Sequence, residues 1–176
     1  AAAVCKRHVQ NEGIFQYPDK SKGVHLEMEL VIALCRGGKD IKQEDAMNCV
    51  FGYAVVLDMT RRDLQGVAKK NGRPWEVGKA FEKSAPCGEI VPAAQVRGLE
   101  NARIWLDVNG ETRQDGNINQ LIWNIPETIT YLSGLFTLAP GDLIYSGTPS
   151  GVGAIIKGDV MKGAVEGVSE ITINVS

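Results

Sequence analysis

The feature that most constrains this chain is an alternation of polar and apolar residues over 24–30, followed by four apolar residues. In an extended strand, neighbouring side chains point to opposite faces, so the apolar members would be buried together. The polar members, which would share the other face, are His25, Glu27 and Glu29. Two glutamates placed this close repel each other unless a cation or a basic side chain lies between them. We therefore expect a strand over 24–35 that carries a metal site or, alternatively, is an edge strand with a solvated charged face.

The rest of the chain predicts a strand-dominated α+β fold. Residues 52–57 are almost uniformly apolar and β-prone, as expected of a strand that is buried on both faces. An Asn-Gly pair lies between the largely apolar run 104–108 and the polar run 111–114, which predicts a hairpin with a type I′ turn. Residue spacing predicts helices over 61–70 and over 121–135, the second kinking or restarting at its proline. We expect the 176 residues to form a single catalytic domain, 1–176.

Charge and composition argue against several classes of partner. The 19 basic and 21 acidic residues are interspersed and leave a formal net charge of -2, so there is no basic stripe for nucleic acid or an anionic membrane. No apolar run approaches the roughly 20 residues that a bilayer span requires. The four cysteines form no CxxC pair, and we interpret them as reduced thiols. We expect a cytoplasmic protein, or a mitochondrial one if a transit peptide has been removed.

A third carboxylate strengthens the metal interpretation. Asp58 follows the buried strand, where an uncompensated charge would be costly. Together with the two glutamates it would offer three oxygen donors, a set that suits Mg²⁺, Mn²⁺ or Ca²⁺ better than zinc. The alternative is an ion pair between Asp58 and Arg61 or Arg62, which are close in the sequence. Spacing alone leaves both interpretations open.

Other residues suggest a binding site for an anion. Arg62 and Gln65 are three apart, so in a helix they share one face and could bind a carboxylate-bearing substrate. Lys79, in a connection over 73–88 that reads as irregular, could support an anionic intermediate. The alternatives are a surface cluster and a solvated lysine. The glycine-rich segment 147–153 lacks the Gly-Lys-Ser/Thr ending of a nucleotide-binding loop, which argues against ATP or GTP but leaves a backbone loop that lines a site.

Five motifs occur in a fixed order between about residues 24 and 160. They are His25-Leu26-Glu27-Met28-Glu29-Leu30, Gly52-Tyr53 leading to Asp58-Met59-Thr60-Arg61-Arg62-Asp63-Leu64-Gln65, Lys79-Ala80-Phe81, Val108-Asn109-Gly110-Glu111, and Pro140-Gly141-Asp142-Leu143-Ile144 with Gly147-Thr148-Pro149-Ser150-Gly151-Val152-Gly153. This combination resembles the fumarylacetoacetate hydrolase family, and within it the small acylpyruvate and fumarylpyruvate hydrolases. Five ordered motifs make a chance match rare.

The resemblance implies a mixed β-roll fold, usually in a homodimer, and one divalent cation. The implied metal ligands are Glu27, Glu29 and Asp58. Mg²⁺ is the expected cation, with Mn²⁺ or Ca²⁺ as alternatives. In this interpretation His25 is a neighbour that shapes the site and is not a ligand.

The resemblance also implies a small anionic 2-oxo acid as substrate and a role in the catabolism of aromatic compounds. The side chains implied to face the substrate are Arg62, Gln65, Lys79 and Thr148, the first three of them as catalytic residues. The cation would chelate the 2-oxo acid end of a 1,3-diketo acid and stabilise the enolate left when water splits the carbon–carbon bond. The alternatives are decarboxylation or keto–enol isomerisation of oxaloacetate, and a non-catalytic, metal-stabilised domain that binds a 2-oxo acid.

One departure from the family concerns the activation of water. Family members usually carry a Tyr-x-x-His-x-x-Glu-like segment upstream, and this sequence shows none. His8 and Glu12 have the wrong spacing for that role, and we expect both to be exposed. We expect that the printed chain lacks an N-terminal portion that carries the segment.

Overall fold

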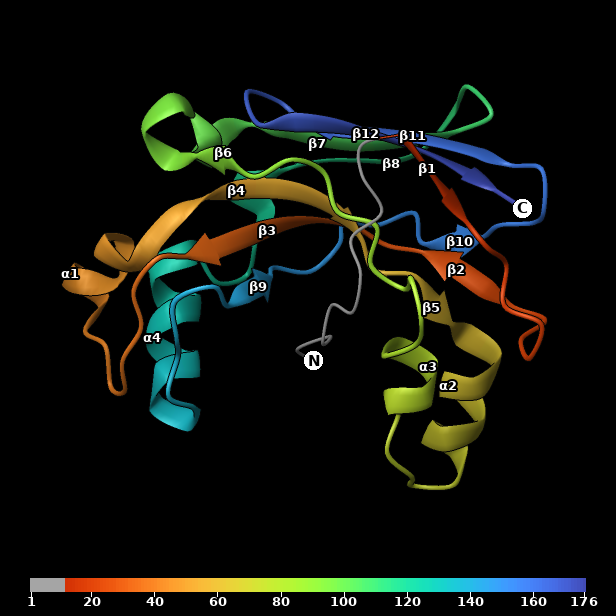
Figure 1. The fold of residues 1–176 in the computed structure, drawn as a ribbon, viewed down its shortest axis with the longest axis horizontal. Helices are drawn as coiled ribbons and strands as arrows, with labels where there is room; N and C mark the ends of the chain where they lie inside the picture. The colour runs from red at the N-terminus through yellow and green to blue at the C-terminus, as the bar shows by residue number, and fades with distance from the viewer. Residues whose placement is uncertain (1–11) are drawn as a thin grey trace.

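A five-stranded sheet forms one layer of the molecule, at the top of Figure 1. The computed structural model describes residues 12–176. In order across the sheet, the strands are β1 (Glu12–Phe15), β12 (Ser169–Val175), β11 (Val160–Val165), β7 (Arg103–Val108) and β8 (Glu111–Asn117). Only the β1–β12 pair in this sheet is parallel, so the sheet is mixed. The side chains of His8 and Glu12 lie outside the described part of the structure.

The β7–β8 hairpin turns where the sequence predicts it. Asn109 and Gly110 both adopt positive φ angles, 54° and 84°, as a type I′ turn requires. Glycine reaches this region without strain, and asparagine tolerates it better than most residues.

A four-stranded antiparallel sheet lies beneath the first (Figure 1). Its order is β6 (Val91–Pro92), β4 (Val50–Leu57), β3 (Met28–Leu34) and β9 (Leu143–Tyr145). Residues 52–57 of β4 and all of β3 are buried, as expected of strands covered on both faces. Because β3 pairs with β4 on one side and β9 on the other, the interpretation of this stretch as an edge strand is wrong.

The predicted strand over 24–35 is divided in two. Its first part, β2 (Val24–Leu26), belongs to a three-stranded sheet with β10 (Gly153–Ala154) and β5 (Thr60–Arg61), whereas its second part is β3. At Glu27 the antiparallel pairing continues in the same register, because the Glu27 carbonyl accepts a hydrogen bond from Asp58 N at 2.8 Å, between the His25–Thr60 and Met28–Leu57 pairs. The neighbouring strand on the other side changes from β10 to β9. The alternation of buried apolar and polar side chains continues across the break, because the apolar residues on both sides of it lie in the core.

The helices are short and lie at the ends of the sheets. They are α1 (Gln43–Ala46), α2 (Arg62–Lys70), α3 (Glu76–Lys79) and α4 (Ile125–Leu135), with the 3₁₀ turns η1 (Met47–Cys49), η2 (Ala93–Gln95), η3 (Leu99–Asn101) and η4 (Ile118–Gln120). The prediction of α2 is confirmed. The helix expected over 121–135 begins at Ile125 instead, because Asn124 caps it and Pro126 fits its first turn. Among the described residues, no helix is long and apolar enough to cross a membrane.

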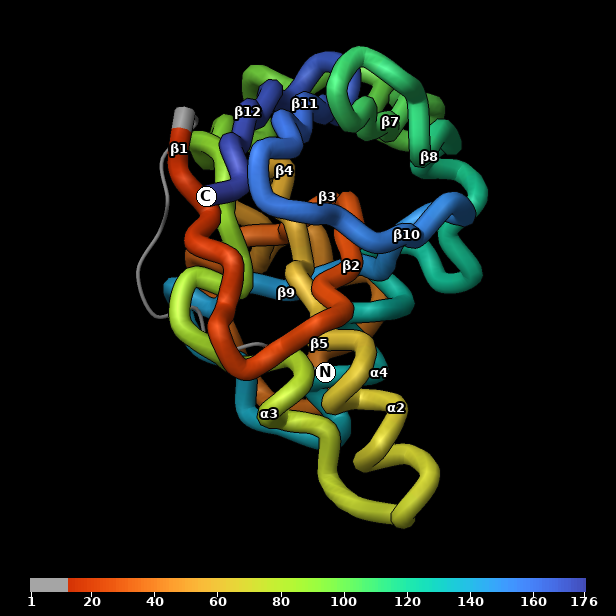
Figure 2. The backbone as a smooth tube through the Cα atoms, turned by 90° about the vertical axis from the view of Figure 1, so that its right-hand side faces the viewer, coloured from red at the N-terminus to blue at the C-terminus, as the bar shows by residue number. Residues whose placement is uncertain are grey.

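One hydrophobic core joins the three sheets. Its largest fully buried side chains include Leu26, Met28, Leu57, Leu106 and Ile171. Figure 2 shows α2 and α3 below β5 and β2, at the end of the molecule opposite the five-stranded sheet. This arrangement brings α2 and α3 beside the β2–β3 break.

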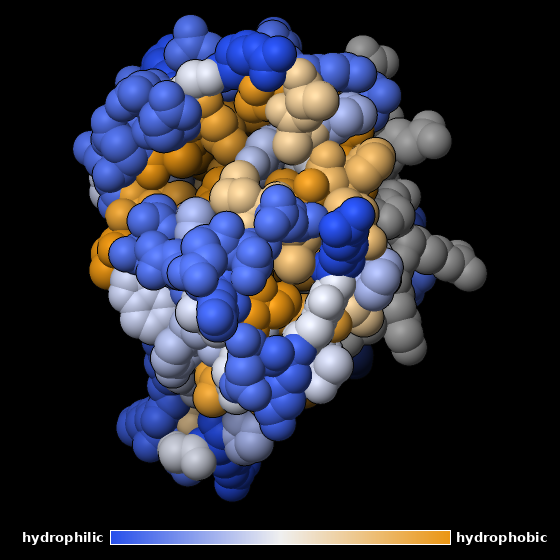
Figure 3. Space-filling view, turned by 90° about the vertical axis from the view of Figure 1, so that its left-hand side faces the viewer, coloured by the Kyte–Doolittle hydropathy of each residue, from blue (hydrophilic) through white to orange (hydrophobic). Residues whose placement is uncertain are grey.

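The face at the α1 end of the molecule is partly apolar. Figure 3 shows hydrophobic side chains gathered in a hollow that polar residues surround. Met47, in η1, and Phe51, the second residue of β4, are 44% and 49% exposed. Met47 lines a cavity of about 310 Å³ together with Leu99, Leu121 and Ile125. A cluster of exposed apolar side chains of this kind often marks a site where another molecule binds.

Candidate active site

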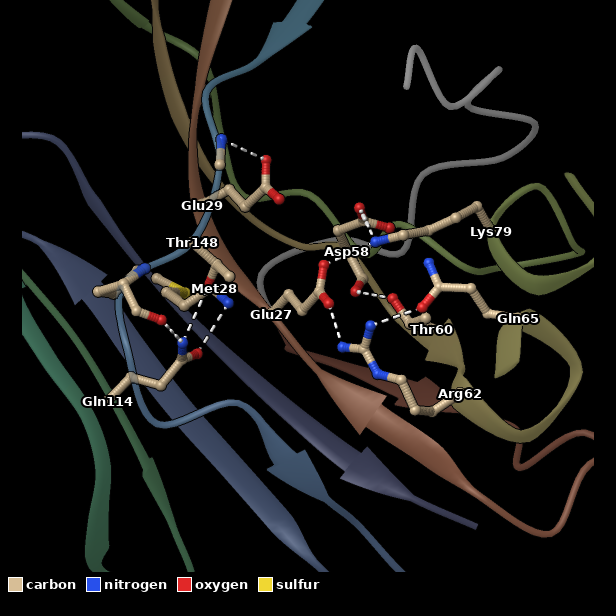
Figure 4. Close-up of polar contacts among 12 residues, drawn as sticks. Glu27, Met28, Glu29, Asp58, Thr60, Arg62, Gln65, Lys79, Gln114 and Thr148 are labelled. Atoms are coloured by element: carbon tan, nitrogen blue, oxygen red, sulfur yellow. Dashed lines mark hydrogen bonds and ion pairs between the residues drawn. The ribbon is translucent and has the colours of Figure 1, made fainter. Parts of the chain in front are cut away.

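Three buried carboxylates meet at the break between β2 and β3. Glu27 lies at the break, Glu29 is the second residue of β3, and Asp58 directly follows β4. The antiparallel register of β3 and β4 places Met28 opposite Leu57, which brings the two strand ends together. One oxygen of each carboxylate lies within 4.8 Å of the others, and the residues are only 5–8% exposed (Figure 4). The structure thus brings together the three carboxylates that the sequence singled out, and their role as metal ligands stays a prediction.

Two cationic side chains contact this cluster. Lys79 Nζ lies 2.6 Å from Glu27 Oε2 and 2.6 Å from Asp58 Oδ2. The guanidinium of Arg62 forms an ion pair with the other oxygen of Glu27. Asp58 is therefore ion-paired, but its partner is not one of the two arginines close to it in the sequence. The first of those, Arg61, stacks on the ring of Phe81, with its guanidinium carbon 4.2 Å from the ring centre.

Close packing of two helices places Lys79. The stretch 73–88 is not wholly irregular, since it contains α3, which ends at Lys79. A Cβ atom at Gly78 would lie 3.1–3.3 Å from atoms of Gln65, which is tighter than an ordinary contact, so glycine at this position favours the close approach of α3 to α2. The approach directs Lys79 to the carboxylates.

Arg62 and Gln65 share one face of α2, as predicted. Gln65 Oε1 accepts a hydrogen bond from an Arg62 guanidinium nitrogen at 2.7 Å. Gln65 is only 4% exposed, so the pair is not a solvated surface cluster. Within residues 12–176, no hydrogen-bond acceptor is found for the Gln65 amide nitrogen, so it can donate to a ligand.

Burial dominates the electrostatics of the site. Burial, and then the neighbouring Asp58 carboxylate, raise the pKa of Glu29 to about 7. Burial also raises the pKa of Asp58, although its hydrogen bond from Lys79 opposes the shift. Burial alone would lower the pKa of Lys79, but its hydrogen bonds to Asp58 and Glu27 outweigh burial and raise it. The lysine is therefore cationic at neutral pH, whereas Glu29 binds a proton readily.

The cluster fits a divalent cation. Three carboxylates face two cationic side chains, which leaves one excess negative charge when all three are ionised. Asp58 Oδ1 is buried and has no hydrogen-bond donor among residues 12–176. Such an oxygen is costly unless a cation or donor contacts it. An all-oxygen donor set is typical of Mg²⁺, Mn²⁺ and Ca²⁺ sites. His25 does not join the three residues of the cluster.

The glycine-rich segment 147–153 lines the site. Gly147 N donates to Glu29 Oε2 at 3.0 Å, so this loop contacts a candidate ligand directly. A Cβ atom at Gly151 would lie 1.9 Å from the carbonyl oxygen of Arg113, and its φ of +99° also favours glycine. Thr148 faces a cavity of about 760 Å³ beside the loop, lined in part by Leu121. None of the three carboxylates lines that cavity.

Sequence reasoning missed one residue of this region, Gln114. The side chain is fully buried and bonds both to the β3 backbone and to the glycine-rich loop (Figure 4). No signal in the sequence could have found it, because residues 111–114 are all polar and show no alternation.

Comparison with known proteins decides the family. Residues 6–176 match the family described as fumarylacetoacetate (FAA) hydrolase C-terminal. The chain belongs to the fumarylacetoacetate hydrolase family. One member of this family, a fumarylpyruvate hydrolase of a Ralstonia species, is 47% identical over 167 residues, which are 95% of this chain and 86% of the relative. A mitochondrial oxaloacetate decarboxylase of Dictyostelium discoideum is 40% identical over 160 residues, or 91% of this chain and 73% of the relative.

A solved structure supports the same family and fold. The crystal structure of fumarylpyruvate hydrolase from Pseudomonas aeruginosa, in complex with Mn²⁺ and pyruvate, matches with a TM-score of 0.91. It is 49% identical, and the match covers 95% of this chain and 73% of that chain. The predicted family, and the strand-dominated α+β fold with mixed sheets, are thereby confirmed.

Proposed function

We propose that this protein is a divalent-metal-dependent hydrolase that cleaves the carbon–carbon bond of acylpyruvates such as fumarylpyruvate. The observation that carries the proposal is the buried cluster of three carboxylates flanked by Arg62 and Lys79. Support comes also from the 47% identity to a fumarylpyruvate hydrolase. Hydrolysis adds water across the bond between the acyl carbon and the methylene carbon, which yields a carboxylic acid and pyruvate.

We assign the cation to Glu27, Glu29 and Asp58. The excess negative charge supports this assignment, as does Asp58 Oδ1, which has no hydrogen-bond donor among the described residues 12–176. Mg²⁺ is the proposed native ion, with Mn²⁺ and Ca²⁺ as alternatives, because all three prefer oxygen donors. When bound, the cation supplies Lewis-acid polarisation of the 2-oxo acid end of the substrate.

The neighbouring side chains would bind and orient an anionic substrate. Arg62 and Gln65 present N–H donors from one face of α2 and would hold carboxylate oxygens. Thr148 presents a hydroxyl from the opposite side of the site. Lys79, held between two carboxylates, would bring positive charge close to the enolate that remains when the carbon–carbon bond breaks.

We further propose that two copies associate through the apolar face at the α1 end. Exposed Met47 and Phe51 beside an apolar hollow support this contact. Analytical ultracentrifugation checks it: a dimer that Phe51→Asp converts to a monomer is expected, and a wild-type monomer would contradict it. A location in the cytoplasm and a role in the catabolism of aromatic compounds stay predictions.

A second candidate is decarboxylation of oxaloacetate. The 40% identity to an oxaloacetate decarboxylase favours it, and oxaloacetate is also a small anionic 2-oxo acid. A third possibility is a non-catalytic domain that binds a 2-oxo acid. The same residues would serve all three, so geometry does not separate them.

One assay separates these candidates. The full-length protein is loaded with Mg²⁺ or Mn²⁺ and given fumarylpyruvate or oxaloacetate, with ultraviolet absorbance following the substrate and chromatography identifying the products. We expect fumarylpyruvate to give fumarate and pyruvate in equal amounts, and excess EDTA to stop the reaction. Turnover of oxaloacetate but not of fumarylpyruvate would favour the decarboxylase over the hydrolase. Turnover of neither substrate would favour the non-catalytic domain that binds a 2-oxo acid.

A further inference from the structure

We propose that Gln114 is a positioning residue that sets the spacing between the carboxylate-bearing strand and Thr148. Its side-chain amide forms three hydrogen bonds inside the site (Figure 4). Oε1 accepts from Met28 N at 2.9 Å, at the backbone position between Glu27 and Glu29. Nε2 donates to Thr148 Oγ1 and to the carbonyl of Pro149, both at 2.8 Å. One amide from β8 therefore joins the strand of candidate metal ligands to the loop of the candidate substrate contact.

The orientation of this amide is determined by its neighbours. Met28 N–H can only donate and the Pro149 carbonyl can only accept, so Oε1 must face β3 and Nε2 must face the loop. A rotated amide would lose both bonds while fully buried, at a high cost. Gln114 thus has one favourable arrangement, as a positioning group requires.

The arrangement also orients the hydroxyl of Thr148. Because Thr148 Oγ1 accepts a hydrogen bond from Gln114, its own hydrogen must point elsewhere. No described residue between 12 and 176 provides an acceptor for that hydrogen. The Thr148 hydroxyl is therefore prepared to donate a hydrogen bond to an oxygen of the substrate. The role of Thr148 belongs to the proposed function, and the inference rests on it to that extent.

Steric contacts hold the same loop against β8. The space beside Gly151 is closed by the carbonyl of Arg113, and a Cβ at Gly116 would lie 3.0 Å from Pro149 Cβ. These contacts limit how close the loop can come, but they do not set its register along β8. The bonds from Gln114 are directional, so they provide that register.

Hydrogen exchange tests the positioning role in metal-free protein. We expect Gln114→Met, which keeps the length but removes all three bonds, to increase amide exchange in residues 146–151 by at least about 10-fold. Leu106→Val is the matched control, because Leu106 is fully buried and lies opposite Gln114 on β7. The control should leave exchange in the loop within about 2-fold of wild type. Unchanged loop exchange in Gln114→Met would overturn the proposal.

A double-mutant cycle tests the connection to Thr148, with pyruvate as the probe and calorimetry on Mn²⁺-loaded protein. We expect Gln114→Met and Thr148→Val each to raise the Kd for pyruvate about 10-fold, and the double variant to be no weaker than the weaker single one. Multiplicative losses would show that Gln114 acts independently of Thr148 and would overturn the proposal. Thr148→Ser, which keeps the hydroxyl, should bind pyruvate like wild type.

A failure of the Gln114 proposal can be distinguished from a failure of the proposed hydrolase function. Loop exchange and pyruvate binding require no turnover, so a protein that binds pyruvate but cleaves no acylpyruvate would sink the hydrolase alone. If Gln114→Met does not fold, Thr148→Val provides a second test. This variant removes the oxygen that accepts a hydrogen bond from the Gln114 side-chain NH₂, so hydrogen exchange of that NH₂, followed by NMR, should become faster. Unchanged exchange of that NH₂ would contradict the bond on which the proposal stands.

Discussion

The ammonium nitrogen of Lys79 lies 2.6 Å from Asp58 Oδ2, with both side chains largely buried. The same nitrogen is 2.6 Å from a carboxylate oxygen of Glu27. Lys79 thus provides positive charge in the metal-free protein at the place where we propose a cation. Removing one member of a buried ion pair leaves its partner's charge uncompensated.

Lys79→Met should therefore destabilise the metal-free protein, by about 2 kcal/mol or more, because Glu27 and Asp58 lose a shared counter-ion. Mn²⁺ should raise the Tm of the variant more than that of wild type, since the ion replaces the lost charge. Thermal unfolding with and without Mn²⁺ measures both effects. Lys70→Met, at the exposed end of α2, is the control. Equal Tm values for the two variants would show that the Lys79 pairs contribute nothing to stability.

Asp58→Ala should weaken Mn²⁺ binding by at least about 100-fold, because it removes one of three anionic oxygen donors. Calorimetric titration of the metal-free protein measures the affinity. Asp115→Ala, which removes an exposed carboxylate that pairs with Arg103, should bind Mn²⁺ like wild type. An unchanged affinity in Asp58→Ala would show that Asp58 is merely the ion-pair partner of Lys79.

Glu29→Gln should stabilise the metal-free protein at pH 8, by at least about 2 °C in Tm. The pKa of Glu29 is about 7 in the folded protein and about 4.3 when unfolded, so ionising it costs stability as pH rises through this window. The gain should thus be complete above pH 7 and should shrink towards pH 4. Melting curves at pH 5 and 8 test this, and a gain of the same size at both would contradict the pKa shift.

Asp63→Asn should reduce stability at neutral pH but not in acid. Burial alone would raise the pKa of Asp63, yet hydrogen bonds from Lys22 N, the Ser21 hydroxyl and Leu64 N lower it. A carboxyl with a lowered pKa stabilises the fold above its unfolded pKa of about 3.9, and the stability is lost as pH falls through the folded value. The difference in Tm between wild type and variant should become smaller as pH falls below the unfolded pKa of about 3.9. A difference that does not become smaller between pH 7 and the lowest pH at which both proteins stay folded would indicate that the charge of Asp63 has no part in it.

The patterns of polar and apolar residues along the strands explain which parts of the site could be predicted from the sequence. The alternation over 24–30 assigned Glu27 and Glu29 to one face, and the apolar run over 52–57 located the strand that delivers Asp58. Both are local properties of a strand. The break at Glu27 could not be predicted, because it coincides with a change of neighbouring strand from β10 to β9, and both are distant in sequence.

Tertiary placement explains what the sequence did not show. Lys79 reaches the carboxylates through the close packing of α3 on α2, which Gly78 favours, and neither helix carries a pattern that specifies this contact. Gln114 is buried because the glycine-rich loop covers it, although its strand is otherwise polar and largely exposed. Both features arise from contacts between segments far apart in the chain.

The most direct test of the account is the position of a bound ion. Crystals grown with Mn²⁺ and measured at the manganese absorption edge should show one strong anomalous peak in contact with Glu27, Glu29 and Asp58. Asp58→Ala crystals, treated alike, should lose that peak. A peak elsewhere, or none while Lys79 still bridges Glu27 and Asp58, would contradict the proposed metal centre.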